Sequence, residues 1–234
     1  MSTELMQAFT AIGAELQTET RGHGVTIDVR RLPDREVFLL QQPSFRTITA
    51  EAIDVRPHHR HLVLDVYGDW LPVSGRFLCG HDEHHWFVAS LPFGRATQSV
   101  RGAMEALKPP LVLREQKRKG VTHRRHRRQT QAYVRQGEWF FLPRPRMHVD
   151  FEHVEQNGRL ARRGGKPHQV EWLYSIDEGL QFARGRVSHA DHSTLHLDVW
   201  HRVVQNNEPE PQRQQQRPSV RQRQHPSIDV AFVD

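Results

Sequence analysis

Residues 193–204 read STLHLDVWHRVV, and this stretch sets the expected fold of the second half of the chain. Apolar residues occupy alternate positions, namely Leu195, Leu197, Val199 and Val203. His196 and Asp198 fall on the opposite side. Successive side chains of a strand point to opposite faces, so the alternation predicts a strand with one buried and one polar face.

Three further segments before this strand have the same character: AYVRQGEWFFL (132–142), QVEWLYSI (169–176) and LQFARGRVS (180–188). Each is rich in β-branched and aromatic residues. The segments RRGGKPH (162–168) and SHADHS (188–193) fit the loops between them. Residues 132–206 are therefore predicted to form a β-rich unit, a small sandwich or barrel.

The N-terminal part of the chain predicts a separate α+β unit over residues 1–110. A helix is expected over residues 3–17, where Leu5, Phe9, Ile12 and Leu16 recur at helical spacing. The β signal then dominates to about residue 92. A second helix is expected over residues 97–107, stopped by the prolines that follow. The predicted fold class is α+β: a helix, sheet and helix unit followed by the β-rich unit.

The remaining segments are unusual in composition. Residues 111–131 are dense in cations, and we expect a basic linker or arm there, because like charges repel one another. Residues 207–227 are dominated by Gln, Arg and Pro and are expected to be disordered. Residues 228–234, IDVAFVD, alternate well enough to dock as a terminal strand.

The amino-acid composition indicates which partners and which cellular compartment to expect. The 234 residues carry a net charge of +6 and include 17 histidines and one cysteine. The charge favours polyanionic partners, and the lone cysteine fits a reducing compartment. No apolar run reaches the roughly 20 residues that a membrane span needs, and the N-terminus does not resemble a secretory signal. We therefore expect a cytoplasmic protein with no membrane partner.

The segment CGHDEHHWFV (79–88) combines the cysteine with three histidines. We expect a structural hairpin that turns at Asp82 and Glu83, with Phe77 and Phe87 inside. Cys79 shares the side of Phe77 and is expected to be buried rather than to bind a metal. The tip would then display the histidines.

A second group of histidines is a candidate for a metal site. Histidine is a common ligand of zinc and of other divalent metals. Histidines on one face of a small β barrel resemble the cupin arrangement, although the HxH of the cupin pattern is missing here. Asp191, Asp198 or Glu171 are candidate bases. The candidate ligands are His168, His189, His192 and His196.

The basic run carries eight Lys or Arg residues between positions 114 and 128. Such a cluster can neutralise several phosphates of a nucleic acid and release their counterions. Tyr133, Trp139 and Phe140 follow and could stack on bases. The candidate nucleic-acid contacts are Arg114, Lys117, Arg118, Lys119, Arg124, Arg125, Arg127 and Arg128.

Two segments carry a resemblance to other sequences. CGHDEHHWFVA and RQGEWFF, the latter opening with Arg135, Gln136, Gly137 and Glu138, are similar to segments of uncharacterised bacterial proteins. The resemblance implies no activity, ligand or catalytic residue.

Three functions stay open at this point. The first is an accessory or binding protein that contacts nucleic acid through the basic arm. The second is a hydrolase-like enzyme that uses a histidine-bound divalent metal such as zinc. The third is a protein-interaction module without a catalytic site, whose ligand is a protein partner. The sequence has no P-loop, dinucleotide fingerprint or nucleophile elbow, which argues against those chemistries.

Overall fold

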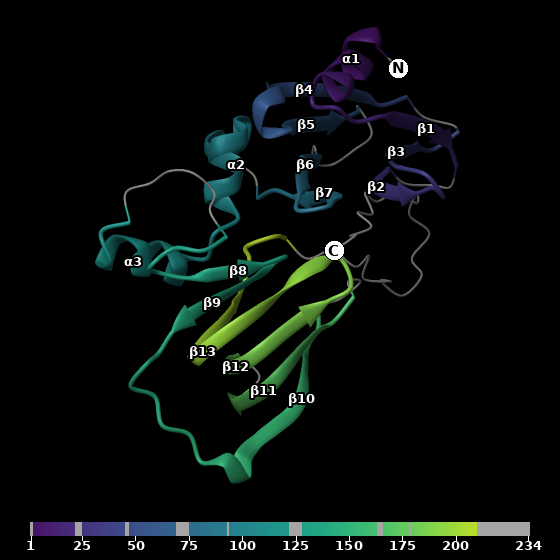
Figure 1. Ribbon diagram of the computed structural model, residues 1–234. Coiled ribbons are helices and arrows are strands. Elements are labelled where there is room, and N and C mark those ends of the chain that lie inside the picture. Colours follow the sequence, from purple (N-terminus) through teal and green to yellow (C-terminus); the bar gives the residue numbers. More distant parts are fainter. Residues whose placement is uncertain are drawn as a thin grey trace, which may run out of the picture. The chain divides into compact units, whose positions relative to one another are not determined.

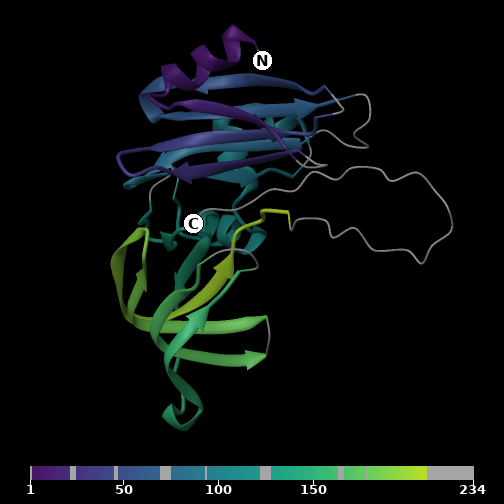
Figure 2. The same cartoon turned by 90° about the vertical axis from the view of Figure 1, so that its right-hand side faces the viewer.

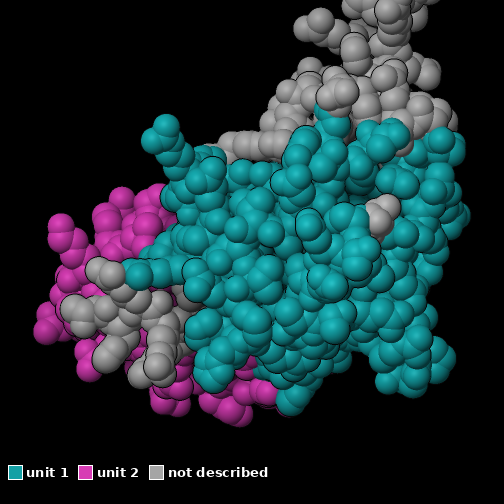
Figure 3. Space-filling view, turned by 90° about the horizontal axis from the view of Figure 1, so that it is seen from above, with its two compact units in different colours: residues 1–106, 208–233 teal, residues 107–207, 234 magenta. Residues whose placement is uncertain are grey.

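The computed structural model describes residues 2–21, 25–44, 47–68, 75–92, 94–121, 128–162, 166–177 and 179–209. Figure 1 shows the chain as a ribbon, and Figure 3 colours its two compact units. The first unit contains the described residues up to Ala106 together with Glu208 and Pro209, and the second contains the described residues of Leu107–Asn207. Each unit is described by itself below.

The first unit begins with helix α1 (Thr3–Ala11). The hydroxyl of Ser2 accepts a hydrogen bond from the Leu5 N–H (3.2 Å) and caps the helix. The helix ends earlier than the predicted residue 17, because Gly13 has a φ of +81° and the chain turns there. Leu16 instead begins the first strand.

Two sheets complete the first unit (Figures 1 and 2). Strands β1 (Leu16–Thr20), β3 (Glu36–Gln42) and β2 (Thr26–Arg31) form one sheet in that order, with β1 parallel to β3. The other is an antiparallel meander of β4 (Thr49–Arg56), β5 (His61–Tyr67), β6 (Gly75–Asp82) and β7 (His85–Ser90). Side chains of α1 and of both sheets share one hydrophobic core. A single short helix turn, η1 (Pro57–His59), connects β4 and β5.

The second predicted helix is shorter than expected. A 3₁₀ turn, η2 (Arg95–Gln98), is followed by extended backbone at Ser99 and then by α2 (Val100–Ala106). The carboxylate of Asp54 accepts a hydrogen bond from the Val100 N–H (2.8 Å), which fixes the start of α2 against β4.

The second unit is built on one six-stranded antiparallel sheet. Its order is β10-β11-β12-β13-β9-β8. The strands are β8 (Val134–Gln136), β9 (Trp139–Pro143), β10 (Val154–Leu160), β11 (His168–Asp177), β12 (Leu180–His189) and β13 (His192–Gln205), and the turn η3 (Phe151–His153) precedes β10.

This sheet folds back on itself without closing into a barrel. Trp139 pairs with Gln205 at the end of β13, yet the side chain of Gln136 donates to the Ser193 carbonyl (2.7 Å) near its start. The β8–β9 hairpin can reach both ends of β13 because this long strand bends, as Figure 2 shows. The expected barrel or two-sheet sandwich is therefore replaced by a curled sheet, with β10 and β8 at its two edges.

The expected linker at residues 111–131 is corrected in its first part. Residues 110–118 form helix α3 (Pro110–Arg118), with Pro110 in its first turn. Val112 and Gln116, one turn apart, are buried. Val112 belongs to a cluster with Tyr133, Phe140 and Leu142. The charged residues of this segment therefore occupy the exposed face of an amphipathic helix.

The segment that we expect to be disordered and the terminal strand after it lie outside the described residues from position 210 onwards. No helix in the described part of the chain is long and apolar enough to cross a membrane.

Candidate metal centre

Three histidines meet where three strands begin or end. His168 is the first residue of β11, His189 the last of β12 and His192 the first of β13. Each offers a ring nitrogen, and these nitrogens lie within 4.8 Å of one another. Among the described residues, this is the group of His, Cys, Asp and Glu side chains that converges closely enough to hold a metal ion.

Local strand pairing explains the convergence. The two-residue turn Ala190-Asp191 places His189 directly opposite His192. On the other side of β12, Gln169 pairs with Ser188, which brings His168 to the same end of the sheet. The three histidines are thus positioned by backbone pairing between strands.

The rings lie against one another. The centroids of His168 and His189 are 4.2 Å apart with 19° between the planes, and those of His189 and His192 are 4.9 Å apart. Imidazolium ions at these distances would repel one another.

His168 is the most constrained of the three. Its side chain is fully buried (0% exposed), and neither ring nitrogen has a hydrogen-bond partner within the described residues. Burial, followed by the neighbouring His189 and His192, lowers the pKa of His168 to about 3. The ring is therefore neutral at physiological pH, and an unsatisfied buried nitrogen costs about 1–3 kcal/mol. A bound ion would remove that cost.

The turn between β8 and β9 lies over the centre. Gly137 has a φ of +54°, and a Cβ added there would stand 3.0 Å from Nε2 of His192 and 3.3 Å from Nε2 of His168. These two nitrogens therefore face the glycine backbone. The neighbouring Gln136 is buried, and its bond to Ser193 ties this turn to the β12–β13 hairpin.

The hairpin turn carries a buried acid. The Asp191 carboxylate accepts from the Lys166 ammonium (2.9 and 3.2 Å), and Lys166 lies two residues before His168. The Asp191 backbone N–H donates to Nδ1 of His189 (3.2 Å). A neutral imidazole has one acceptor nitrogen, so His189 must give up this bond when it ligates a metal.

The ring nitrogens are near enough to one another to meet at a single zinc ion once the rings turn. Zinc binds histidine nitrogen at about 2.0–2.1 Å in a tetrahedron, so ligand nitrogens of one site stand about 3.3 Å apart. The ring nitrogens of His168, His189 and His192 lie within 4.8 Å of one another, and the stacked rings of His168 and His189 must rotate before both can face one ion. Three protein ligands leave one position of the tetrahedron for a small molecule.

His196, the fourth candidate ligand, does not join this group. Its neighbours Leu195 and Leu197 pack into the inner core, so His196 lies on the outer face of β13. There it lines a separate pocket with Glu171 and Asp198, two of the candidate bases. Asp191, the third candidate base, lies in the hairpin between two of the clustered histidines.

Gln136 and Gly137 were not predicted as parts of the site. Both residues belong to the RQGE segment, whose resemblance to other sequences implied no ligand or activity. Their position over the histidines depends on the fold-back of the sheet, which alternation patterns do not show.

The CGHDEHHWFV hairpin differs from the prediction by one residue. The turn falls at Glu83 and His84 rather than at Asp82 and Glu83, with φ of +49° at Glu83. Asp82 therefore pairs with His85, and Trp86 faces the core in place of Phe87, which is only half-buried. A shift of one residue reverses every side chain of a strand.

Cys79 and Phe77 are buried, as expected. Burial raises the pKa of the Cys79 thiol well above its usual value, which is unfavourable for a metal ligand. His81 packs edge-on against Trp86 (4.9 Å). His85 interacts with the Glu36 carboxylate (2.8 Å), so the histidines of this hairpin have structural contacts.

The candidate nucleic-acid contacts are only partly described. Arg114, Lys117, Arg118 and Lys119 are exposed on α3, where Arg118 pairs with Glu115 (2.6 Å). Arg128 is half-buried before β8. The other three predicted contacts, Arg124, Arg125 and Arg127, lie outside the described residues.

Comparisons with protein-family models, curated proteins and solved structures found no match to this chain. The function is therefore argued from the residues and their geometry.

Proposed function

We propose that the second unit binds a divalent transition metal, zinc, through His168, His189 and His192. The observation that carries this proposal is the state of His168: a fully buried, neutral imidazole without a hydrogen-bond partner within the described residues, in contact with two further imidazoles. A buried polar group without a partner calls for an explanation, and a shared metal ion supplies one.

The donor set argues for zinc or a similar metal. Three imidazoles without an oxygen ligand do not suit calcium or magnesium, which take oxygen donors. Cys79 is buried in the first unit and is not a candidate for the same ion.

The open fourth position favours chemistry over a purely structural role, because structural zinc sites usually have four protein ligands. Zinc held by three histidines lowers the pKa of a coordinated water to about 7 and can polarise a carbonyl or phosphoryl group. The class of function that this geometry supports best is therefore metal-dependent hydrolysis. His168 stays neutral and available as a ligand down to acidic pH, and Gln136 holds the β8–β9 turn over the site.

Competition against a chromophoric chelator tests the proposal. Purified, untagged protein should take one zinc per chain. Each of His168→Ala, His189→Ala and His192→Ala should weaken the affinity by at least about 100-fold. His196→Ala, which removes a histidine from the outer face of the same strand, should bind zinc as the parent does. Equal affinities for all five proteins would refute the proposal.

A second candidate function, contact with nucleic acid, is supported by the exposed cations of α3. Arg114 and Lys117 project from helix α3 and Lys119 is its C-cap residue, so they present charge without the ordering cost of a free arm. Affinity for a short single strand should fall as salt rises, by about 0.7 log units per log unit of salt for each phosphate neutralised.

The matched test replaces Arg114, Lys117 and Lys119 with Gln and compares the result with Arg21, Arg95 and Arg101→Gln in the first unit. Both variants lose three exposed cations. The salt slope should become shallower in the α3 variant only. An equal change in both variants would indicate a response to net charge alone and would remove this candidate.

A further inference from the structure

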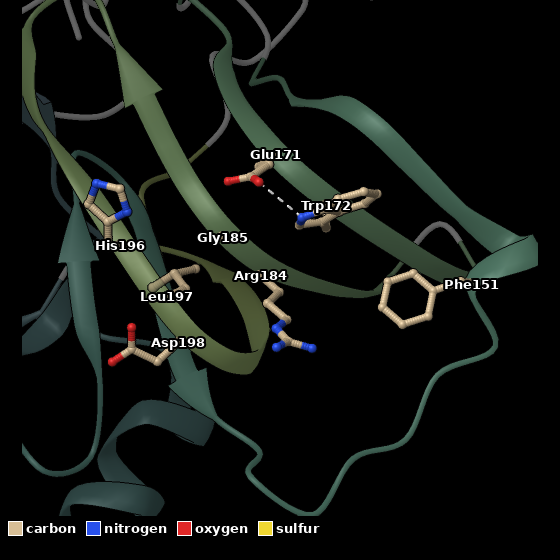
Figure 4. A pocket seen from close by; sticks show the side chains of 8 residues that line it. All are labelled: Phe151, Glu171, Trp172, Arg184, Gly185, His196, Leu197 and Asp198. Atoms are coloured by element: carbon tan, nitrogen blue, oxygen red, sulfur yellow. Dashed lines mark hydrogen bonds between the residues drawn. The ribbon is translucent and has the colours of Figure 1, made fainter.

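The outer face of the second unit carries a pocket that the metal proposal does not use. It has a volume of about 380 Å³ and lies across β11, β12 and β13 (Figure 4). Its principal side chains come from all three strands and from η3. They are Phe151, Glu171, Trp172, Arg184, His196 and Asp198.

Gly185 creates the space for the side chain at the centre of this pocket. A Cβ at Gly185 would stand 2.6 Å from Oε2 of Glu171, and the φ of +82° also disfavours a larger residue. Glu171 lies over the glycine and accepts hydrogen bonds from the Arg186 N–H (2.8 Å) and from the indole N–H of Trp172 (3.1 Å). The carboxylate and the indole are therefore held in place before any ligand arrives.

One wall of the pocket is aromatic and exposed. Phe151 is 57% exposed, yet its ring packs edge-on against Trp172 (5.9 Å between centroids) and touches Trp200 (6.5 Å). Aromatic side chains beside a few polar groups are the usual lining of a ligand pocket. Trp172 itself is half-buried and offers part of its ring to the same space.

The charges in the pocket are mixed. Glu171 and Asp198 are acidic, and Arg184 is basic, so the pocket does not attract a strongly anionic ligand. The same side chains offer both hydrogen-bond donors and acceptors around the aromatic wall. This combination fits a neutral ring that carries hydroxyl groups: its C–H face stacks on an aromatic side chain, and its hydroxyls both donate and accept.

From these observations we propose that the pocket binds a saccharide. Trp172 and Phe151 form the stacking surface, Asp198 and Glu171 accept from sugar hydroxyls, and Arg184 and His196 complete the polar contacts. The site is independent of the metal centre and needs no zinc.

Saturation-transfer difference NMR with a panel of neutral pyranoses and their disaccharides tests the proposal. At least one sugar should bind with a Kd near or below about 1 mM, in buffer with or without EDTA. Trp172→Ala should weaken binding by at least about 10-fold, and so should Asp198→Asn, which alters only an exposed side chain. Tyr67→Ala, which removes an exposed aromatic ring of the first unit, is the matched control and should bind normally.

Three results would overturn the proposal. One is the absence of binding by every sugar in the panel. Another is binding that Trp172→Ala and Asp198→Asn both leave unchanged. The third is binding of nucleoside monophosphates, but of no sugar, that depends on Trp172, since that would assign the pocket to nucleic acid. None of them bears on the zinc affinity of His168, His189 and His192.

Discussion

The imidazole rings of His168 and His189 are stacked, with centroids 4.2 Å apart and 19° between their planes. A metal ion binds an imidazole nitrogen close to the plane of its ring, so two parallel stacked rings cannot both ligate one ion as they stand. Binding of zinc should therefore rotate these rings apart. In long-range ¹H–¹⁵N NMR spectra, one equivalent of zinc should shift the ring nitrogens of His168, His189 and His192 together.

His196 is the internal control for that experiment, since it lies on the outer face of the sheet. Its ring nitrogens should not move at one equivalent. Shifts at His196 that match those of the clustered histidines would mean that zinc binds elsewhere in the second unit.

Replacing Gly137, which lies over the histidine group, should weaken zinc binding. Gly137→Ala would place a methyl group 3.0 Å from Nε2 of His192, so we expect zinc affinity to fall by at least about 10-fold. Gly120 provides the matched control, because its φ of +62° carries the same strain and a Cβ there meets nothing within 4 Å. Both variants should lose about 1 kcal/mol of unfolding free energy. Equal zinc affinities for them would show that Gly137 does not border the site.

The first unit contains a carboxylate whose burial opposes folding at neutral pH. Burial raises the pKa of Asp28 from 3.8 to about 6, partly offset by a hydrogen bond from the Val29 N–H. The folded state binds the extra proton, so stability should fall as the pH rises from about 3.8 to about 6. Asp28→Asn should therefore raise the unfolding free energy at pH 7 by about 1–3 kcal/mol and leave it nearly unchanged below pH 4.

Urea unfolding at several pH values measures this effect. Asp34→Asn is the control, because that carboxylate is exposed. An Asp28→Asn gain that is the same at pH 4 and pH 7 would show that desolvation of the charge is not its cause.

The thiol of Cys79 should react very slowly with a disulfide reagent in the native protein, because the side chain is buried and its pKa is raised. Denaturant should make the reaction fast. Treatment with a chelator should leave the native rate unchanged. A chelator-induced rise would identify Cys79 as a metal ligand and contradict the assignment of the hairpin as structural.

Alternation along strands predicted much of the second unit from sequence. Leu195, Leu197 and Val203 pack inward as predicted, and His196 between the first two points outward. Val199, predicted on the same inward face, is only half-buried and is not in that core cluster.

Strict alternation would place His192 and His196, four residues apart, on the same face of β13. A register shift between Leu195 and His192 separates them. This irregularity has no marker in the local sequence, so His196 was wrongly grouped with the other three histidines.

Register and long-range closure could not be predicted. No Asn-Gly or Asp-Gly pair marks the turn of the CGHDEHHWFV hairpin, so an error of one residue exchanged Phe87 for Trp86 as the core residue. The contact between Gln136 and Ser193 spans 57 residues and depends on the bend of β13. It has no local signature.

Helix α3 was not predicted from the sequence, because its segment is dense in charged residues. Its cations suggested a solvated linker, but Val112 packs in an apolar cluster with Tyr133 and Phe140. Gln116, one turn further along the helix, is also buried. Tyr133 and Phe140 belong to another segment of the chain, so tertiary packing rather than local composition decides the structure.

X-ray absorption at the zinc edge of the 1:1 complex would identify the metal ligands. We predict three imidazole nitrogens and one further light atom at about 2.0–2.1 Å, with the outer-shell scattering of imidazole rings. His168→Ala should lose this spectrum, and His196→Ala should retain it. A zinc ion with one imidazole or none, or a spectrum that His168→Ala leaves unchanged, would contradict the assignment of His168, His189 and His192 as the metal centre.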